Sequence, residues 1–133
     1  MTVCNTLSTC ASVGFSVVFT NSAPSFAASS TNSVSLSFGS STTFNLPAYS
    51  DPDVDSLVLT SAESGQSVLP AFVTLAAGVF IINPNSAGQA GVFTIDNTIC
   101  DGGNLCSTFT FTITVIDIPV LVAPSPNVLL VDI

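Results

Sequence analysis

The side chains best suited to chemistry are the carboxylates of Asp51, Asp53 and Asp55, which alternate along one short segment. Three carboxylates at alternate positions of a turn can converge on one hard cation, and Ca²⁺ takes roughly six to eight oxygen ligands. Aspartates in a turn also commonly accept hydrogen bonds from nearby backbone amides. The spacing therefore leaves two interpretations open: a calcium site, or a solvated turn that its own aspartates cap.

The four cysteines form two pairs of equal spacing, Cys4 with Cys10 and Cys100 with Cys106. Common zinc sites use more closely spaced thiolates together with histidines, and the sequence has no histidine. A reactive thiolate needs a neighbouring cation to lower its pKa, and Lys and Arg are absent too. We therefore expect two intrachain disulfides in preference to free thiols, and an extracellular or cell-surface location.

All eight charged side chains are acidic, and the net charge at pH 7 is −8. Without a cation the chain cannot neutralise a phosphate backbone, which excludes nucleic acid as a partner. Serine and threonine nucleophiles have no histidine or lysine base to activate them. A glycosidase would need two carboxylates across a substrate groove, but the chain has no Trp and one Tyr to line such a groove. The composition therefore predicts a protein that is not an enzyme.

Hydrophobic residues make up 47 % of the 133 residues, which favours a folded chain. The longest apolar run, near residues 75–82, falls far short of the roughly 20 residues that a spanning helix needs, so we expect no membrane insertion. No Asn-x-Ser/Thr sequence occurs, whereas the many Ser and Thr hydroxyls would allow O-linked glycan.

The segments that follow the two cysteine pairs match each other at one constant offset. Apolar side chains alternate in both: Val13, Phe15, Val17 and Phe19 correspond to Phe109, Phe111, Ile113 and Val115. Further along, Pro24 matches Pro119, and the pattern at residues 34–38 matches Leu129, Val131 and Ile133. A period of roughly 95 residues is longer than the units of solenoids and indicates an array of whole domains.

Nearly every segment between the repeated parts reads as a β-strand. Apolar residues alternate with Ser and Thr, and β-branched and aromatic residues dominate. The predicted strands are 34–38, 44–49 with an interruption at Pro47, 57–59, 69–75, 79–82, 92–95 and 109–117. Short strands separated by frequent turns predict an all-β, two-sheet sandwich.

The repeat resembles the cadherin-like, dystroglycan-type members of the immunoglobulin-like sandwich superfamily, which occur in tandem on extracellular proteins. The resemblance rests on the motifs at residues 21–26, 46–57, 69–75, 82–84, 87–95 and 112–117. Phe93 stands where this superfamily often has a tyrosine, so the resemblance implies a corner that lacks the tyrosine hydrogen bond and is looser.

The same resemblance implies a calcium site at a junction between repeats. By position its ligands would be Asp51, Asp53, Asp55, Asn21 and Asp117. The linker around Asn21, however, lacks the acidic residues that cadherin linkers supply.

The ends of the chain carry apolar strand patterns without a sandwich of their own. We expect three parts: residues 1–20 as the last strand of a preceding repeat or a donated strand, residues 21–118 as the sandwich, and residues 119–133 as a linker with the first strand of a following repeat. Exposing the apolar side chains of both ends would forfeit about 1.5–3 kcal/mol each. The sequence therefore predicts a homopolymeric structural subunit or repeat of an extracellular filament or stalk. The alternative is a calcium-dependent adhesion module that binds glycan or protein.

Overall fold

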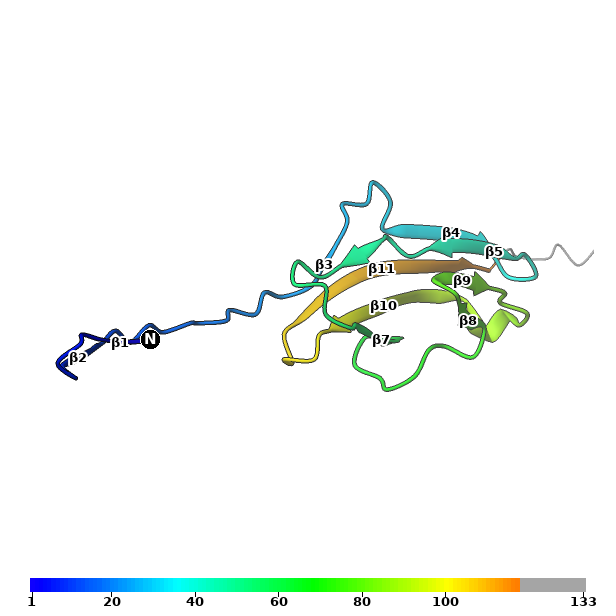
Figure 1. The fold of residues 1–133 in the computed structure, drawn as a ribbon. Coiled ribbons are helices and arrows are strands. Elements are labelled where there is room, and N and C mark those ends of the chain that lie inside the picture. Colours follow the sequence, from blue (N-terminus) through cyan, green and yellow to red (C-terminus); the bar gives the residue numbers. More distant parts are fainter. Residues whose placement is uncertain (118–133) are drawn as a thin grey trace, which may run out of the picture.

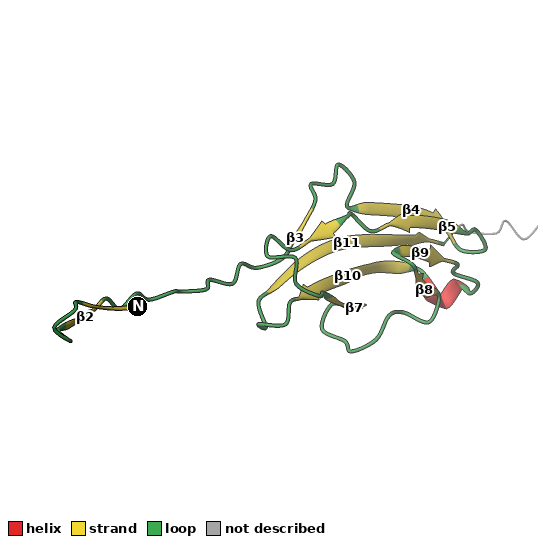
Figure 2. Cartoon of the chain, viewed as in Figure 1, coloured by secondary structure: helices red, strands yellow, loops and turns green. Residues whose placement is uncertain are grey.

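The structure, a computed structural model, describes residues 1–117. Within this range strands dominate, and the helical structure is limited to the short 3₁₀ helix η1 (Ala87–Gln89) (Figure 2). Residues 1–117 contain no helix with the length and hydropathy needed to cross a membrane. The predicted strand with Leu129, Val131 and Ile133 lies outside the described residues.

Two sheets face each other and form the body of the molecule (Figure 1). The first sheet has the spatial order β4 (Ser33–Ser37), β11 (Cys106–Ile116), β10 (Gly91–Cys100), β7 (Val58–Glu63). The second has the order β5 (Thr42–Asn45), β9 (Val79–Ile82), β8 (Val73–Ala76). A small pair, β3 (Ser25–Phe26) with β6 (Tyr49–Ser50), completes the body. All neighbours are antiparallel except β4, which runs parallel to β11.

Alternation of side chains explains why the two sheets pack on each other. Along β11 the threonines point outward, whereas Phe111, Ile113 and Val115 are at most 3 % exposed. The ring of Phe111 stacks on Phe44 with centroids 4.1 Å apart and packs against Phe80 at 4.9 Å. The buried core lies between the sheets and consists of Leu36, Phe44, Phe72, Val73, Phe80, Ile82, Ile95, Phe111, Ile113 and Val115.

One polar side chain occupies an inward position of β10. Asn97 lies between the buried Ile95 and Ile99 and is itself fully buried. Its Oδ1 accepts a hydrogen bond from the Ser61 hydroxyl at 2.7 Å, and its Nδ2 donates to the Phe109 carbonyl at 3.1 Å. These bonds compensate the cost of burying an amide and tie β7 to β11 across β10.

The corner before β10 is closed by Gln89. Its side-chain Oε1 accepts hydrogen bonds from the backbone N–H of Asn85 at 2.8 Å and of Ser86 at 3.1 Å. The Ser86 hydroxyl accepts from Gly88 N–H, which completes a reciprocal cap on η1. Phe93 packs edge-on against Phe72. The corner therefore lacks the tyrosine hydrogen bond, as Phe93 implies, and a glutamine side chain bonds its backbone instead. A looser corner stays a prediction.

The predicted all-β sandwich is confirmed. The interpretation of the apolar segment after Cys10 as the last strand of a preceding repeat, or as a donated strand, stays a prediction, since a single chain holds no neighbouring repeat or subunit. Only β2 (Cys10–Ser12) is a strand there, paired with β1 (Thr2–Cys4), and residues 13–20 form an extended arm outside both sheets (Figure 1). The alternating pattern is present, but within residues 1–117 the arm has no neighbouring strand to pair with.

Candidate functional site

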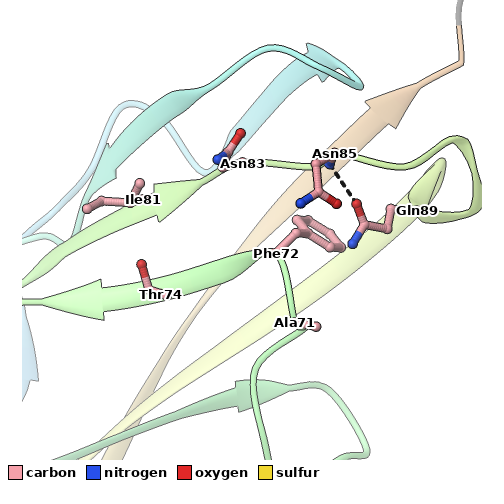
Figure 3. Close-up of a pocket in the computed structure, with 7 residues that line it drawn as sticks. All are labelled: Ala71, Phe72, Thr74, Ile81, Asn83, Asn85 and Gln89. Carbon is pink, nitrogen blue, oxygen red and sulfur yellow. Dashed lines mark hydrogen bonds between the residues drawn. The ribbon is translucent and has the colours of Figure 1, made fainter.

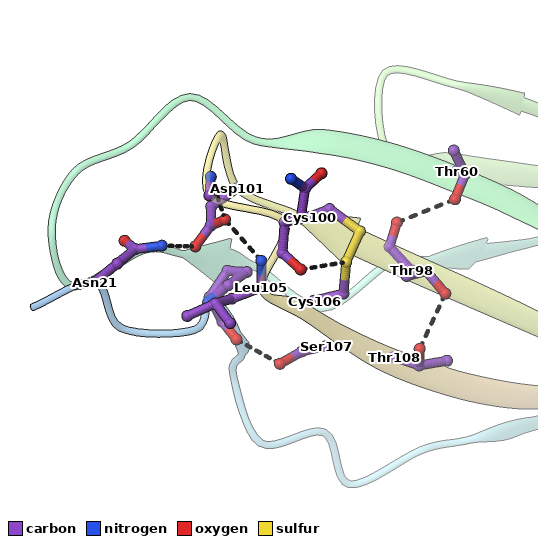
Figure 4. Close-up of a disulfide and its surroundings, with 12 residues drawn as sticks. Asn21, Thr60, Thr98, Cys100, Asp101, Leu105, Cys106, Ser107 and Thr108 are labelled. Atoms are coloured by element: carbon purple, nitrogen blue, oxygen red, sulfur yellow. Dashed lines mark hydrogen bonds between the residues drawn. A yellow bond between two sulfur atoms is a disulfide. The ribbon is translucent and has the colours of Figure 1, made fainter.

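The end of the sandwich nearest the arm is built around the hairpin that joins β10 to β11. Cys100 and Cys106 are directly opposite in the register and form a disulfide. Between them, the Asp101 Oδ1 accepts hydrogen bonds from the backbone N–H of Gly103 at 2.8 Å and of Leu105 at 2.9 Å. The hairpin is therefore fixed twice, by a covalent bond and by one carboxylate that closes its loop (Figure 4).

The segment that leads into the sandwich, residues 21–24, is held against this hairpin. The Asn21 side chain donates from Nδ2 to the second carboxylate oxygen of Asp101 at 2.9 Å. The Ser107 hydroxyl donates to the Pro24 carbonyl (Figure 4). A Cβ at Gly103 would lie 2.3 Å from Asn21 Nδ2, so glycine at this position leaves the space that the amide occupies. We call Asn21, Asp101 and Gly103 the clasp.

The environment of Asp101 changes its acidity. Burial alone would raise its pKa, but the hydrogen bonds from Leu105, Asn21 and Gly103 favour the carboxylate, and the net pKa is lowered from its ordinary value. The clasp is therefore held by a charged acceptor at neutral pH.

Within a single molecule, the five residues proposed as calcium ligands are not brought to one place. Asp51 Oδ1 caps the turn by accepting from the N–H groups of Asp53 and Asp55, and Asp53 Oδ2 accepts from Ser22 N–H at 2.7 Å. Asp117 follows the far end of β11, roughly 35 Å along the strand from the Cys100–Cys106 hairpin. Within residues 1–117 no group of three or more acidic or cysteine side chains is arranged to hold a metal ion. Asp51 and Asp53 thus cap backbone amides, whereas Asp51 Oδ2 is left buried without a partner among the described residues.

The first hairpin is a structural copy of the second, at the offset of 96 residues that separates Cys4 from Cys100. Cys4 and Cys10 form a disulfide with Cα atoms 3.9 Å apart, against 4.1 Å for Cys100 and Cys106. Ser8 and Asn104, at equivalent positions, have φ of 63° and 65°.

The hydrogen bonds of the two hairpins also correspond one to one. The members of each pair differ by at most 0.2 Å. The five pairs are Asn5 N–Thr9 O with Asp101 N–Leu105 O, Ser8 N–Asn5 O with Asn104 N–Asp101 O, Leu7 N–Asn5 Oδ1 with Gly103 N–Asp101 Oδ1, Thr9 N–Asn5 Oδ1 with Leu105 N–Asp101 Oδ1, and Thr2 Oγ1–Ser12 Oγ with Thr98 Oγ1–Thr108 Oγ1. Thus β1 and β2 reproduce the hairpin end of β10 and β11.

The arm that follows the first hairpin exposes the side chains whose counterparts form the core. Phe15 is 81 % exposed, whereas Phe111, its counterpart, is 1 % exposed. Val13, Val17 and Phe19 are likewise exposed. The arm thus has the apolar pattern of β11 without a sheet to cover it.

The sandwich is similar in sequence and fold to known protein domains. Residues 21–114 match the family model described as "Bacterial Ig domain". The chain belongs to this family of bacterial Ig domains. No curated protein matches the chain in sequence.

Several solved structures resemble the Ig domain, and each resemblance covers a part of a longer chain. A nucleoside hydrolase-related hypothetical protein from Saccharophagus degradans, associated with carbohydrate metabolism, aligns with TM-score 0.50 and 18 % identity over 74 % of this chain and 26 % of its own. A structure solved to explain Dscam isoform specificity aligns with TM-score 0.44 and 17 % identity over 72 % of this chain and 25 % of its own. A structure of the N-terminal four Ig domains of a Dscam1 isoform aligns with TM-score 0.39 and 16 % identity over 75 % of this chain and 26 % of its own. The chain thus spans about a quarter of the length of these structures.

Sequence reasoning missed the clasp of the Ig domain. Asn21 was considered as a metal ligand, yet its side chain bonds Asp101, which we had not singled out. A signal was present in the segment Asp-Gly-Gly-Asn between the second pair of cysteines, because an aspartate followed by two glycines favours a tight turn that its side chain caps.

Proposed function

We propose that the chain is a section of a tandem array of Ig domains that forms a non-enzymatic extracellular filament or stalk. In this proposal residues 1–20 supply the last hairpin and last strand of the preceding domain in the same polypeptide. The one-to-one correspondence of the two hairpins carries the proposal, since five equivalent hydrogen bonds and a disulfide recur at a single offset.

The exposed arm supports the same proposal on energetic grounds. Each of its large apolar side chains would gain about 1.5–3 kcal/mol from burial in a sandwich. In the described domain the place between β10 and β4 is already filled by its own β11. A preceding domain of the same chain is therefore a better acceptor for the arm than a second copy of this sandwich.

The clasp gives such an array a defined geometry at each junction. Residues 21–24 pass directly from the arm to the sandwich, and the bonds to Asp101, Asp53 and Ser107 leave this linker little freedom. A linker tied to the following domain transmits orientation from one unit to the next, which a stalk or fibre requires.

An extracellular or surface location and a passive role are part of the proposal. Two disulfides suit an oxidising compartment, and both are formed in the structure. The absence of Lys and His from the sequence leaves no imidazole or amine base to activate a serine or threonine nucleophile.

The proposal is tested by letting residues 1–20 replace their counterparts. In a chimeric chain, residues 21–97 are followed directly by residues 2–20, so that the buried Asn97 is kept and Phe15 takes the place of Phe111. We expect this chain to unfold cooperatively, as a sandwich does, because its hairpin and alternating strand are equivalent to those removed. Circular dichroism during urea denaturation measures this.

A matched pair of variants makes the test specific. In the chimera, Phe15→Asp is expected to abolish folding, whereas Ser16→Asp, on the opposite face of the strand, leaves a folded domain. A chimera that stays unfolded, or one in which both substitutions have the same effect, would contradict the assignment of residues 1–20. Electron micrographs of the full-length natural array are expected to show a fibre with an axial repeat on the order of 40 Å, one sandwich length.

A calcium-dependent adhesion module is the second candidate, and one observation favours it. Asp51 Oδ2 is buried without a hydrogen-bond partner among residues 1–117, and the chain has no cationic side chain to pair with it. The described residues do not supply a full calcium shell, so most ligands would have to be water. Calorimetric titration of the chain and of Asp51→Asn with calcium chloride tests this. Heat from the natural chain alone supports the site, and no heat at millimolar calcium excludes it.

A further inference from the structure

A recess opens on the outer side of the second sheet (Figure 3). The strands β8 and β9 beside it lie away from the arm (Figure 1). Its volume is about 240 Å³, and it lies where β8 and β9 meet the corner before β10. The residues that line it combine an aromatic ring, an aliphatic side chain, a hydroxyl and three amides: Phe72, Ile81, Thr74, Asn83, Asn85 and Gln89. Drug-sized ligands occupy pockets of roughly 300–1,000 Å³, so this recess suits a smaller, single-ring group.

Gln89 presents its amide to this recess in a fixed orientation. Both hydrogen bonds that it accepts from the backbone, at Asn85 and Ser86, end on Oε1. The amide nitrogen Nε2 is therefore the end left to donate to a ligand, and Figure 3 shows the Gln89 and Asn85 amides beside the Phe72 ring. A donor fixed in this way loses little conformational entropy when it binds a ligand.

The chemistry of the lining restricts the ligand to a neutral polar molecule. No charged side chain lines the recess, so an ionic ligand would find no counter-ion there. The amides offer both donors and acceptors, and Thr74 adds a hydroxyl. The 44 % exposed Ile81 adds apolar surface, whereas Phe72, a core residue only 8 % exposed, adds little. A pyranose ring combines adjacent hydroxyls, which both donate and accept, with apolar C–H faces.

We propose that this recess binds one neutral sugar ring, as the end or a branch of a glycan. This inference is independent of the tandem-array proposal, since it uses neither the arm nor the clasp. Binding of a single ring through a few hydrogen bonds gives a dissociation constant on the order of 1 mM.

The experiment is an NMR titration of the ¹⁵N-labelled full chain with glucose, galactose, mannose and N-acetylglucosamine in turn. We expect at least one of these sugars to produce saturable shifts in the side-chain amide signals of Gln89, Asn83 and Asn85. No saturable shift with any of the four up to about 50 mM would overturn the proposal. Larger shifts with N-methylacetamide, a mimic of the peptide bond, would overturn it too, in favour of peptide recognition.

Two amide-to-acid variants separate binding from folding. Gln89→Glu keeps an oxygen for the Asn85 and Ser86 amides, so the corner remains closed, but it removes the Nε2 donor. We expect sugar binding to weaken about tenfold with little change in Tm. Asn45→Asp adds the same charge at an exposed position of β5, outside the recess. We expect this variant to bind the sugar as the natural chain does. Unchanged binding by Gln89→Glu, or an equal loss in both variants, would overturn the assignment.

Discussion

Phe111 and Phe15 are counterparts at the repeat offset, but only the replacement of Phe111 by alanine should destabilise the Ig domain. Phe111 is 1 % exposed and stacks on Phe44 at 4.1 Å. Removing a buried phenylalanine costs about 3–5 kcal/mol through lost transfer energy and the cavity left behind. For a domain of roughly 100 residues this lowers Tm by about 12–40 °C. Phe15 is 81 % exposed, so its replacement should change the stability of the chain by less than about 0.5 kcal/mol.

The assay is urea denaturation of Phe111→Ala, Phe15→Ala and the natural chain, each as the monomeric full chain, followed by circular dichroism. We expect the midpoint of Phe111→Ala to fall sharply and that of Phe15→Ala to coincide with the natural midpoint. If Phe15→Ala lost as much stability as Phe111→Ala, the arm would be packed within the same molecule. The reasoning that assigns it to a neighbouring domain would then be refuted.

Three further expectations concern the hairpins and the clasp. In Gly103→Ala the new Cβ would occupy the place of Asn21 Nδ2, so the Asn21 side chain should lose its hydrogen bond to Asp101. We expect faster hydrogen exchange of the Asn21 side-chain amide. Unchanged exchange would mean that the loop between Cys100 and Cys106 shifts instead. Because the folded-state pKa of Asp101 is lowered, its contribution to stability is full above about pH 4 and is lost as the pH falls through its folded-state pKa. Plots of Tm against pH for the natural chain and Asp101→Asn should therefore converge only below about pH 4, and parallel plots would contradict the cause given for the shift. Replacing Cys100 and Cys106 by serine should lower the free energy of unfolding by about 2 kcal/mol. The same change at Cys4 and Cys10 should leave the Tm of the domain unchanged, because the first hairpin lies outside the sandwich. Calorimetry distinguishes the two variants, and equal losses would mean that the first hairpin packs on the domain.

The strands of the sandwich could be predicted from sequence because burial imposes alternation that is visible residue by residue. Thr112, Ile113 and Thr114 show it, since the isoleucine is buried and the threonines face outward. The turn of Ala77 and Gly78, both at positive φ, was also visible as a break between two apolar runs.

For residues 13–20 alternation predicts which face of a strand can be buried, and not which strand will cover it, so the partner of this segment stays a prediction. Asn97 and Asp101 were missed for a related reason. Their roles depend on partners distant in sequence, Ser61 for the first and Asn21 for the second. Gln89 was missed as well, because its role depends on the local path of the backbone, which brings the Asn85 and Ser86 amides to its side-chain oxygen.

The parallel pairing of β4 with β11 determines how the domain would respond to tension along a fibre. The ladder runs from Ser33 opposite Thr112 to Ser37 opposite Ile116, with the chain arriving at one end of the sandwich and leaving β11 at the other (Figure 1). A pull on the two ends of the domain therefore draws these strands past each other along their length. In this shearing geometry the hydrogen bonds of the ladder share the load, whereas an antiparallel terminal pair would open one bond at a time. We expect the clasp and the short β3–β6 pair, which precede β4 in the chain, to give way first, and the β4–β11 ladder then to set a high unfolding force for a domain of this size.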